Sequence, residues 1–99
     1  MVRIKKNEET LTIRVEGHAG YAEKGKDIVC SAVSILLYAY AAELLKQGIS
    51  GELRDDGEVL EITPSRPTEQ ARIAFETAVT GLGMLAETYE GYVYVEGGD

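Results

Sequence analysis

The chain contains a single cysteine, Cys30, and a single histidine, His18, on either side of a glycine-containing loop at residues 17–26. A cysteine attacks a carbonyl carbon as the thiolate, and an imidazole within hydrogen-bond reach can take the thiol proton and later give it to the leaving group. The loop is long enough to fold back and bring the two side chains together. The pair is therefore a candidate nucleophile and general base.

The residue at the start of the following helix bears on this chemistry. Asp27 stands where a helix N-cap is expected, because its carboxylate can accept the amide hydrogens of the first turn. Cys30 is then the third helical residue, where the positive end of the helix dipole favours a thiolate. The Asp27 carboxylate opposes that thiolate, yet it could orient His18 as the third group of a triad does. Both roles of Asp27 stay open.

Other interpretations compete for the same residues. Taken singly, Cys30 fits a small buried residue and His18 an exposed loop residue. A metal site made of His18, Asp27 and Cys30 lacks the paired spacing of zinc ligands. Residues 20–27 match a phosphate-binding loop except at the last position, where Asp27 replaces the hydroxyl that would bind magnesium. We therefore expect no metal and no cofactor.

Periodicity predicts the elements that position the site. Strands with alternating apolar and polar residues are expected at residues 2–5, 11–16, 52–54, 59–63 and 92–96, with hairpin turns at 6–9 and 55–57. Helices are expected at residues 28–47, ending at Gly48, and about 68–89, ending at Gly91. Gly81 and Gly83 each weaken the second helix by about 1 kcal/mol relative to alanine, which indicates a close approach to a neighbour or a bend.

The order strand, strand, helix, strand, strand, helix, strand predicts an α+β fold for a single domain of residues 1–99. We expect a two-layer sandwich of about five strands in one sheet, with two long helices on one face. The first helix is apolar nearly all round, more than one sheet face can bury, so a homodimer is expected. Ser31, Ser34 and Glu43 interrupt its apolar stretch, which favours a buried helix over a membrane span.

Composition and charge limit the kinds of binding partner and the cellular location that we expect. The 99 residues include 10 Lys and Arg against 17 Asp and Glu, a formal charge of −7, which argues against direct binding of nucleic acid and favours a basic or neutral partner. A single cysteine cannot form an intramolecular disulfide, and residues 1–15 show no secretory signal. A cytoplasmic location is therefore expected.

Nine residues in and around the loop form a recognisable motif: Gly17, His18, Gly25, Asp27, Ile28, Val29, Cys30, Val33 and Ser34. This motif resembles that of the bacterial ribosomal-processing cysteine protease family, and the likeness extends over essentially the whole chain. The resemblance implies that Cys30 is the nucleophile and His18 the general base. It gives Asp27, Gly17, Gly25 and Ser34 supporting roles.

The resemblance also implies a substrate: an enzyme of this family removes an N-terminal extension from a basic protein of the large ribosomal subunit, and it works as a homodimer. Amide hydrogens at the start of the first helix would then be the oxyanion donors, and residues 19–26 a lid. One alternative is a noncatalytic ribosome-associated module that holds a basic peptide. Another is a single-cysteine redox protein, which would need an external thiol.

Overall fold

The computed structural model describes residues 1–23 and 27–96. Its elements are β1 (Val2–Asn7), β2 (Thr12–Glu16), α1 (Ile28–Lys46), β3 (Gly51–Asp55), β4 (Val59–Pro64), α2 (Glu69–Thr88) and β5 (Val93–Val95). This order is the expected one, and each observed boundary of the two helices lies within one residue of the prediction. The α+β class is thereby confirmed.

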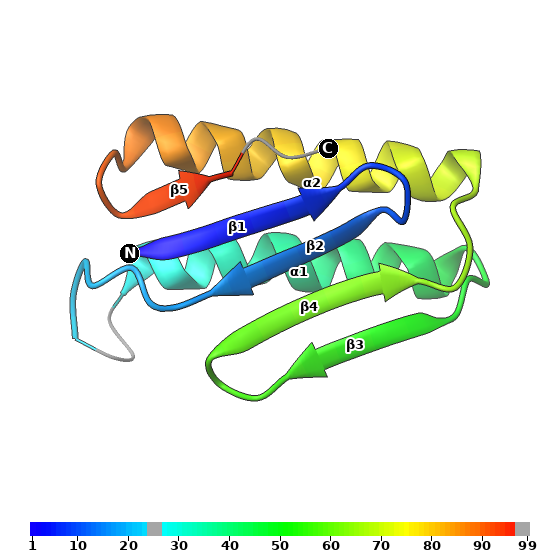
Figure 1. Ribbon diagram of the computed structural model, residues 1–99, viewed down its shortest axis with the longest axis horizontal. Helices are drawn as coiled ribbons and strands as arrows, with labels where there is room; N and C mark the ends of the chain where they lie inside the picture. Colours follow the sequence, from blue (N-terminus) through cyan, green and yellow to red (C-terminus); the bar gives the residue numbers. More distant parts are fainter. Residues whose placement is uncertain (24–26, 97–99) are drawn as a thin grey trace.

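The five strands form one mixed sheet in the order β3-β4-β2-β1-β5. Neighbouring strands are antiparallel except β5, which runs parallel to β1. A parallel neighbour needs a crossover connection, and α2 is part of it. Both helices lie on the same face of the sheet, which gives the expected two layers (Figure 1).

The turn between β1 and β2 lies later in the chain than predicted. Lys6 and Asn7, expected in the turn, continue β1 and pair with β2. The side-chain oxygen of Asn7 accepts the amide hydrogens of Glu9 at 2.9 Å and Thr10 at 3.1 Å, so the turn forms after Asn7. Leu11, expected in the second strand, instead ends the turn with a φ of 59°. A polar run fits an exposed strand as well as a turn, which is why the pattern misplaced it.

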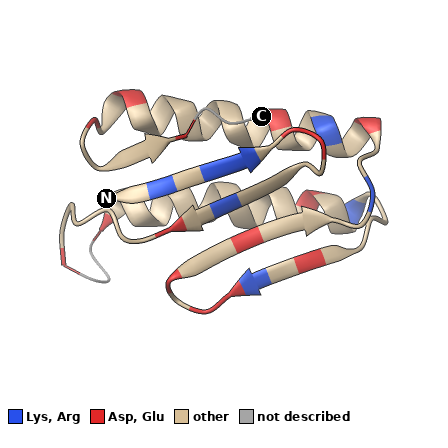
Figure 2. Cartoon of the chain, in the orientation of Figure 1, with Lys and Arg blue, Asp and Glu red and all other residues tan. Residues whose placement is uncertain are grey.

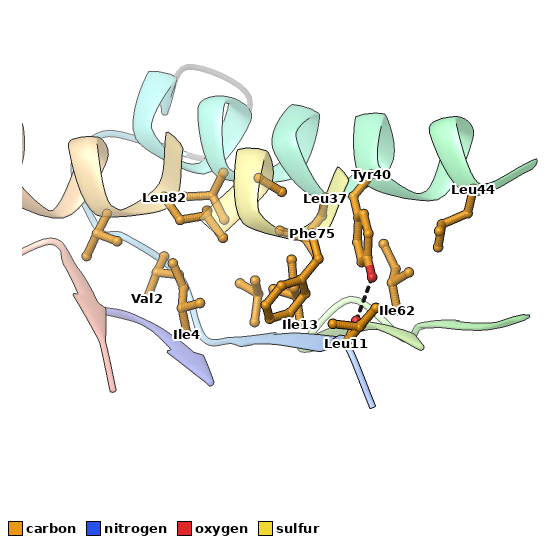
Figure 3. Packing of buried hydrophobic residues seen from close by; sticks show 14 of the residues in the cluster. Val2, Ile4, Leu11, Ile13, Leu37, Tyr40, Leu44, Ile62, Phe75 and Leu82 are labelled. Atoms are coloured by element: carbon orange, nitrogen blue, oxygen red, sulfur yellow. Dashed lines mark hydrogen bonds between the residues drawn. The ribbon is translucent and has the colours of Figure 1, made fainter. Parts of the chain in front are cut away.

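The core lies between the sheet and the two helices (Figure 3). Phe75 of α2 and Leu37 of α1 are fully buried there. Tyr40 packs edge-on against Phe75, with ring centroids 6.1 Å apart, and its hydroxyl donates a 2.6 Å hydrogen bond to the Leu11 carbonyl oxygen. Burial raises the pKa of Tyr40 well above its ordinary value. The bond satisfies the one polar group of this side chain and ties α1 to the first turn.

The two helices approach each other closely at Gly81. A Cβ atom at this position would lie 3.0 Å from two side-chain carbons of Leu36. This confirms the close approach that the glycine predicted. A Cβ at Gly83 would meet nothing within 4 Å, so close approach does not explain the second glycine.

Helix α1 is apolar on two sides. Its buried residues form the stripe that faces the sheet: Val29, Val33, Leu37, Tyr40 and Leu44. Ile35 and Leu45, on other sides of the helix, are 65% and 73% exposed. Among the described residues, α1 is the one helix long and apolar enough to cross a membrane, with a mean hydropathy of 1.9, but that test considers length and composition alone.

Candidate active site

Cys30 and His18 line the same cleft. The loop after β2, the start of α1 and the β3–β4 hairpin lie at one end of the molecule (Figure 1), and residues from all three line the cleft. The cleft has two adjoining hollows, of about 120 and 570 Å³, and Cys30, His18 and Ser34 contribute to the walls of both. The fold therefore brings together the two residues that the sequence singled out.

The two side chains are neighbours in the cleft without a direct bond between them. Within the described residues, Cys30 Sγ accepts a hydrogen bond from the Ala19 amide, 3.2 Å away, and none from His18. His18 Nε2 lies 3.7 Å from Glu58 Oε1, and the imidazole is 61% exposed. An exposed side chain can change rotamer readily, and catalytic hydrogen bonds often close only around a substrate.

Asp27 caps α1, as predicted. Its Oδ1 accepts the amide hydrogens of Val29 at 2.9 Å and Cys30 at 3.0 Å, and its Oδ2 accepts that of Tyr21 at 3.1 Å. Burial of this carboxyl raises its pKa, but the hydrogen bonds, chiefly those from the Cys30 and Tyr21 amides, outweigh burial and hold the pKa below its ordinary value.

The second role expected for Asp27, orienting His18, has no contact to support it in the described part of the chain. The carboxylate beside His18 is that of Glu58, in the β3–β4 hairpin. Sequence reasoning missed Glu58, because only the pairing of β4 with β2 brings the hairpin to this loop. The Gly17 amide donates a 3.1 Å hydrogen bond to the Glu58 carbonyl oxygen and fixes that junction.

Three of the amides at the start of α1, where oxyanion donors are expected, are already engaged. Those of Val29 and Cys30 bind the Asp27 carboxylate, and that of Ser31 binds the Asp27 carbonyl oxygen at 3.1 Å. A single N–H donates one good hydrogen bond, so a substrate oxygen would have to displace the cap to use them. The structure therefore does not support that expectation.

A residue with a side chain would be strained at Gly17, the glycine before His18. Gly17 has a φ of +83°, and a Cβ atom on it would lie 2.8 Å from the Met1 carbonyl oxygen. Ser34 lies one helical turn after Cys30, is exposed and lines the cleft. Gly25, the third supporting residue of the motif, lies outside the described residues.

Replacing Gly17 with alanine should destabilise the protein. The left-handed backbone and the contact with Met1 together cost about 2 kcal/mol or more in the free energy of unfolding. Urea denaturation measures this loss. Gly20→Ala is the matched control, because Gly20 also has a positive φ, +69°, but open space where its Cβ would be. Equal losses in the two variants would contradict the steric role of Met1.

Loss of the Asp27 carboxylate should destabilise α1, by about 1 to 2 kcal/mol for Asp27→Ala. Because the pKa of Asp27 is lower in the folded protein than its ordinary value of 3.8, the ionised group stabilises the fold above that value. This contribution is lost as the pH falls through the folded-state pKa. Urea denaturation of wild type and Asp27→Asn should therefore show a gap in stability at neutral pH that shrinks in acid. A gap that is constant with pH would contradict the charged cap.

An aromatic cluster anchors the loop on its other side. The Tyr21 ring packs edge-to-face against Tyr89, with centroids 5.5 Å apart, and against Tyr92 at 5.2 Å. Such contacts add to the stabilisation from burial. Together with the bond from the Tyr21 amide to Asp27, they hold the described part of the loop against the segment between α2 and β5. Tyr21 was not predicted, since tyrosine in a polar loop carries no pattern.

The far wall of the cleft is acidic. Asp55, Asp56 and Glu58 follow one another around the β3–β4 turn (Figure 2). Hydrogen bonds from the amides of Val59 and Glu58 and from the Arg54 guanidinium lower the pKa of Asp56 to about 2. The Tyr38 hydroxyl, on α1, donates to Asp55 and links the helix to the hairpin. The lining of the cleft thus combines these acidic residues with Cys30.

Comparison with known families decides the class of this protein. The sequence model of the family "Cysteine protease Prp" matches residues 1–94, which is nearly the whole chain. This chain belongs to the Prp cysteine protease family. The protein is therefore an enzyme, a cysteine protease, and the resemblance found in the motif is confirmed.

Individual proteins that are similar to this chain agree with the family assignment. The ribosomal processing cysteine protease Prp of Mycoplasma genitalium is 27% identical over 95 residues, covering 96% of this chain and 94% of that protein. The fold matches the crystal structure of S. aureus Prp in complex with a covalently linked product peptide, at a TM-score of 0.82, 24% identity and coverage of 96% and 95%. It also matches a Streptococcus mutans protein at a TM-score of 0.72 and 28% identity, with 96% and 90% covered.

Proposed function

We propose that this cysteine protease removes the N-terminal extension of a basic protein of the large ribosomal subunit, with Cys30 as the nucleophile and His18 as the general base. The observation that carries the proposal is the meeting of Cys30 and His18 in one cleft, in a chain of the Prp family. The Mycoplasma genitalium relative bears the name ribosomal processing protease, and S. aureus Prp holds a covalently linked product peptide.

The proposed reaction uses each group in turn. His18 takes the thiol proton, and Cys30 Sγ attacks the carbonyl carbon of the scissile peptide bond. When the tetrahedral intermediate collapses, the C–N bond breaks and protonated His18 gives its proton to the leaving amine. The N-terminal extension stays on Cys30 as a thioester. Water, deprotonated by His18, then hydrolyses the thioester and frees the thiol.

Charge supports a basic substrate. The protein has a formal charge of −7, and Asp55, Asp56 and Glu58 line the same cleft as Cys30. Opposite charges speed the encounter of enzyme and substrate, an effect that salt screens. A ribosomal protein that is rich in lysine and arginine fits this surface.

The test uses the extended ribosomal protein from the same source as the enzyme. Intact mass spectrometry should show loss of the extension alone, at a rate that falls as salt is raised from about 50 to 300 mM. The same ribosomal protein made without its extension is the matched control and should stay intact. Cleavage at scattered sites, or a stable complex with no product, would contradict the proposal. The second result would favour a peptide-binding module.

The exposed seam between the helices supports the proposal of a homodimer. Two apolar hollows, of about 440 and 380 Å³, run along the side of the helices away from the sheet. Ile35 of α1 and Ile73 and Met84 of α2 line them, each more than 60% exposed. A second copy of the chain would bury this helix seam and remove its apolar surface from water.

Placing a charge in the helix seam should separate the dimer. We expect wild type to sediment as a dimer at micromolar concentration and Ile35→Glu as a monomer, because a carboxylate buried there would lose its hydration. Leu53→Glu is the matched control: Leu53 is 50% exposed but lies on β3, away from the seam. A monomeric wild type that instead binds lipid vesicles, or a dimer broken by Leu53→Glu alone, would contradict this interface.

We also propose that the enzyme acts in the cytoplasm. A lone thiol nucleophile needs a reducing compartment, and the proposed substrate is a ribosomal protein. Fractionation of cells that carry a tagged chain should place it with the cytosolic proteins. Recovery with the membrane or secreted fraction would contradict this.

A further inference from the structure

We propose that the backbone amide of Ala19 is the hydrogen-bond donor for negative charge at the reaction centre. It would stabilise the Cys30 thiolate before attack and the substrate oxyanion after it. The inference rests on the proposed role of Cys30 as nucleophile. It places the oxyanion donor in the loop after β2 rather than at the start of α1.

Three of the backbone amides at the start of α1 are not free to bind a substrate oxygen. The amides of Val29, Cys30 and Ser31 surround the start of α1, and each already donates to Asp27. Breaking these bonds would destabilise the start of α1, and freeing the Val29 or Cys30 amide would leave the buried carboxylate short of a partner. The nucleophile's own amide, bound to Asp27 Oδ1 at 3.0 Å, is therefore not a free donor.

Ala19 lies beside the nucleophile. Its N–H points at Cys30 Sγ, with nitrogen and sulfur 3.2 Å apart. Ala19 is only 4% exposed, so its methyl group is packed in the core and the peptide unit is held in place. Bonds on either side fix the loop as well: the Gly17 amide to the Glu58 carbonyl and the Tyr21 amide to Asp27. A donor fixed before the reaction stabilises developing charge without reorganisation.

The same N–H can serve both charged species because they are adjacent. In the attack, the sulfur electron pair forms the C–S bond, and the carbonyl π pair moves to the oxygen. That oxygen is bonded to the carbon under attack and so lies next to Sγ, within reach of a donor already aimed at the sulfur. Collapse of the intermediate restores the carbonyl and expels the amine, which takes its proton from His18.

The test replaces this N–H by an ester oxygen. Cys30 is the only cysteine, so a synthetic segment of residues 1–29 can be ligated to a segment that begins with Cys30. Lactic acid in place of Ala19 keeps the methyl group and removes only the donor. The control has the α-hydroxy analogue of glutamate in place of Glu8, which lies in the turn between β1 and β2 and outside the lining of the cleft. The all-amide synthetic protein is the reference for both.

We expect the ester at Ala19 to lower kcat by about 100-fold, with KM changed less than about threefold. Alkylation of Cys30 by iodoacetamide at neutral pH should slow by about tenfold, since a hydrogen bond to the thiolate is lost. The ester at Glu8 should change neither rate by more than about twofold. Equal behaviour of the two esters would overturn the proposal.

The alkylation rate separates this inference from the proposed function on which it rests. Alkylation needs no substrate, so it tests the donor even if the proposed substrate is wrong. If the all-amide protein alkylates normally but cleaves no ribosomal protein, the proposed function fails and the alkylation comparison still decides the role of Ala19. Should the Ala19 ester unfold, Ala19→Pro, which also removes the N–H, is measured in the same two assays against Glu8→Pro.

Discussion

The Cys30→Ala variant is expected to bind its peptide substrate and leave it uncleaved. Without the sulfur no thioester can form, and loss of a catalytic nucleophile lowers the rate by about a million-fold. Cys30 is half-buried and alanine is smaller, so the fold should persist. Mass spectrometry of the substrate measures cleavage, and fluorescence anisotropy of a labelled peptide measures binding.

Two outcomes of this experiment bear on the role of Cys30. If Cys30→Ala still shortens the substrate at a measurable fraction of the wild-type rate, Cys30 is not the nucleophile and the proposed mechanism fails. If it neither cleaves nor binds, its unfolding midpoint decides whether the loss is catalytic or structural. Cys30→Ser provides a second variant of nearly the same size, and it should remain inactive because a hydroxyl ionises far less readily than a thiol.

The His18→Ala variant should retain binding and lose about 100- to 10,000-fold in kcat, the range over which general acid–base groups contribute. KM should change little, because His18 is exposed at the cleft wall and acts on protons rather than on the bulk of the substrate. Steady-state kinetics across pH measure this loss. The rate of the wild type should change with pH in a way that the rate of His18→Ala does not.

Glu58→Gln is the informative companion of His18→Ala. The side chains of His18 and Glu58 are 61% and 76% exposed, and ion pairs this exposed contribute little. The amide variant should therefore lower kcat by less than about threefold. A loss as large as that of His18→Ala would show that Glu58 orients the imidazole as the third group of a triad.

Local rules predicted the parts of the fold that depend on one residue. The carboxylate of Asp27 caps α1, and Gly48 and Gly57 have positive φ values of 74° and 89° at the predicted helix end and hairpin turn. The first turn was misplaced, because Lys6 and Asn7 are polar residues at the end of a strand and their pairing with β2 is a tertiary contact. Polarity alone does not distinguish the two settings.

The candidate site also has residues that the sequence predicts and residues that it does not. Cys30 and His18 could be found from residue type and spacing, and the structure places both in one cleft. Glu58 could not, since its place beside His18 depends on β4 pairing with β2. Ala19 offers no side-chain chemistry at all: what it contributes is a backbone N–H, whose direction is fixed only by the folded loop.

The central claim is that Cys30 carries the acyl group during peptide cleavage. Enzyme mixed with extended ribosomal protein, quenched in acid within milliseconds and digested, should yield a Cys30-containing peptide heavier by the acylated extension. The adduct should disappear with hydroxylamine, which cleaves thioesters, and should be absent from Cys30→Ala. Rapid cleavage without an adduct on Cys30, in wild type or in His18→Ala, would contradict the account. An adduct on another residue would contradict it as well.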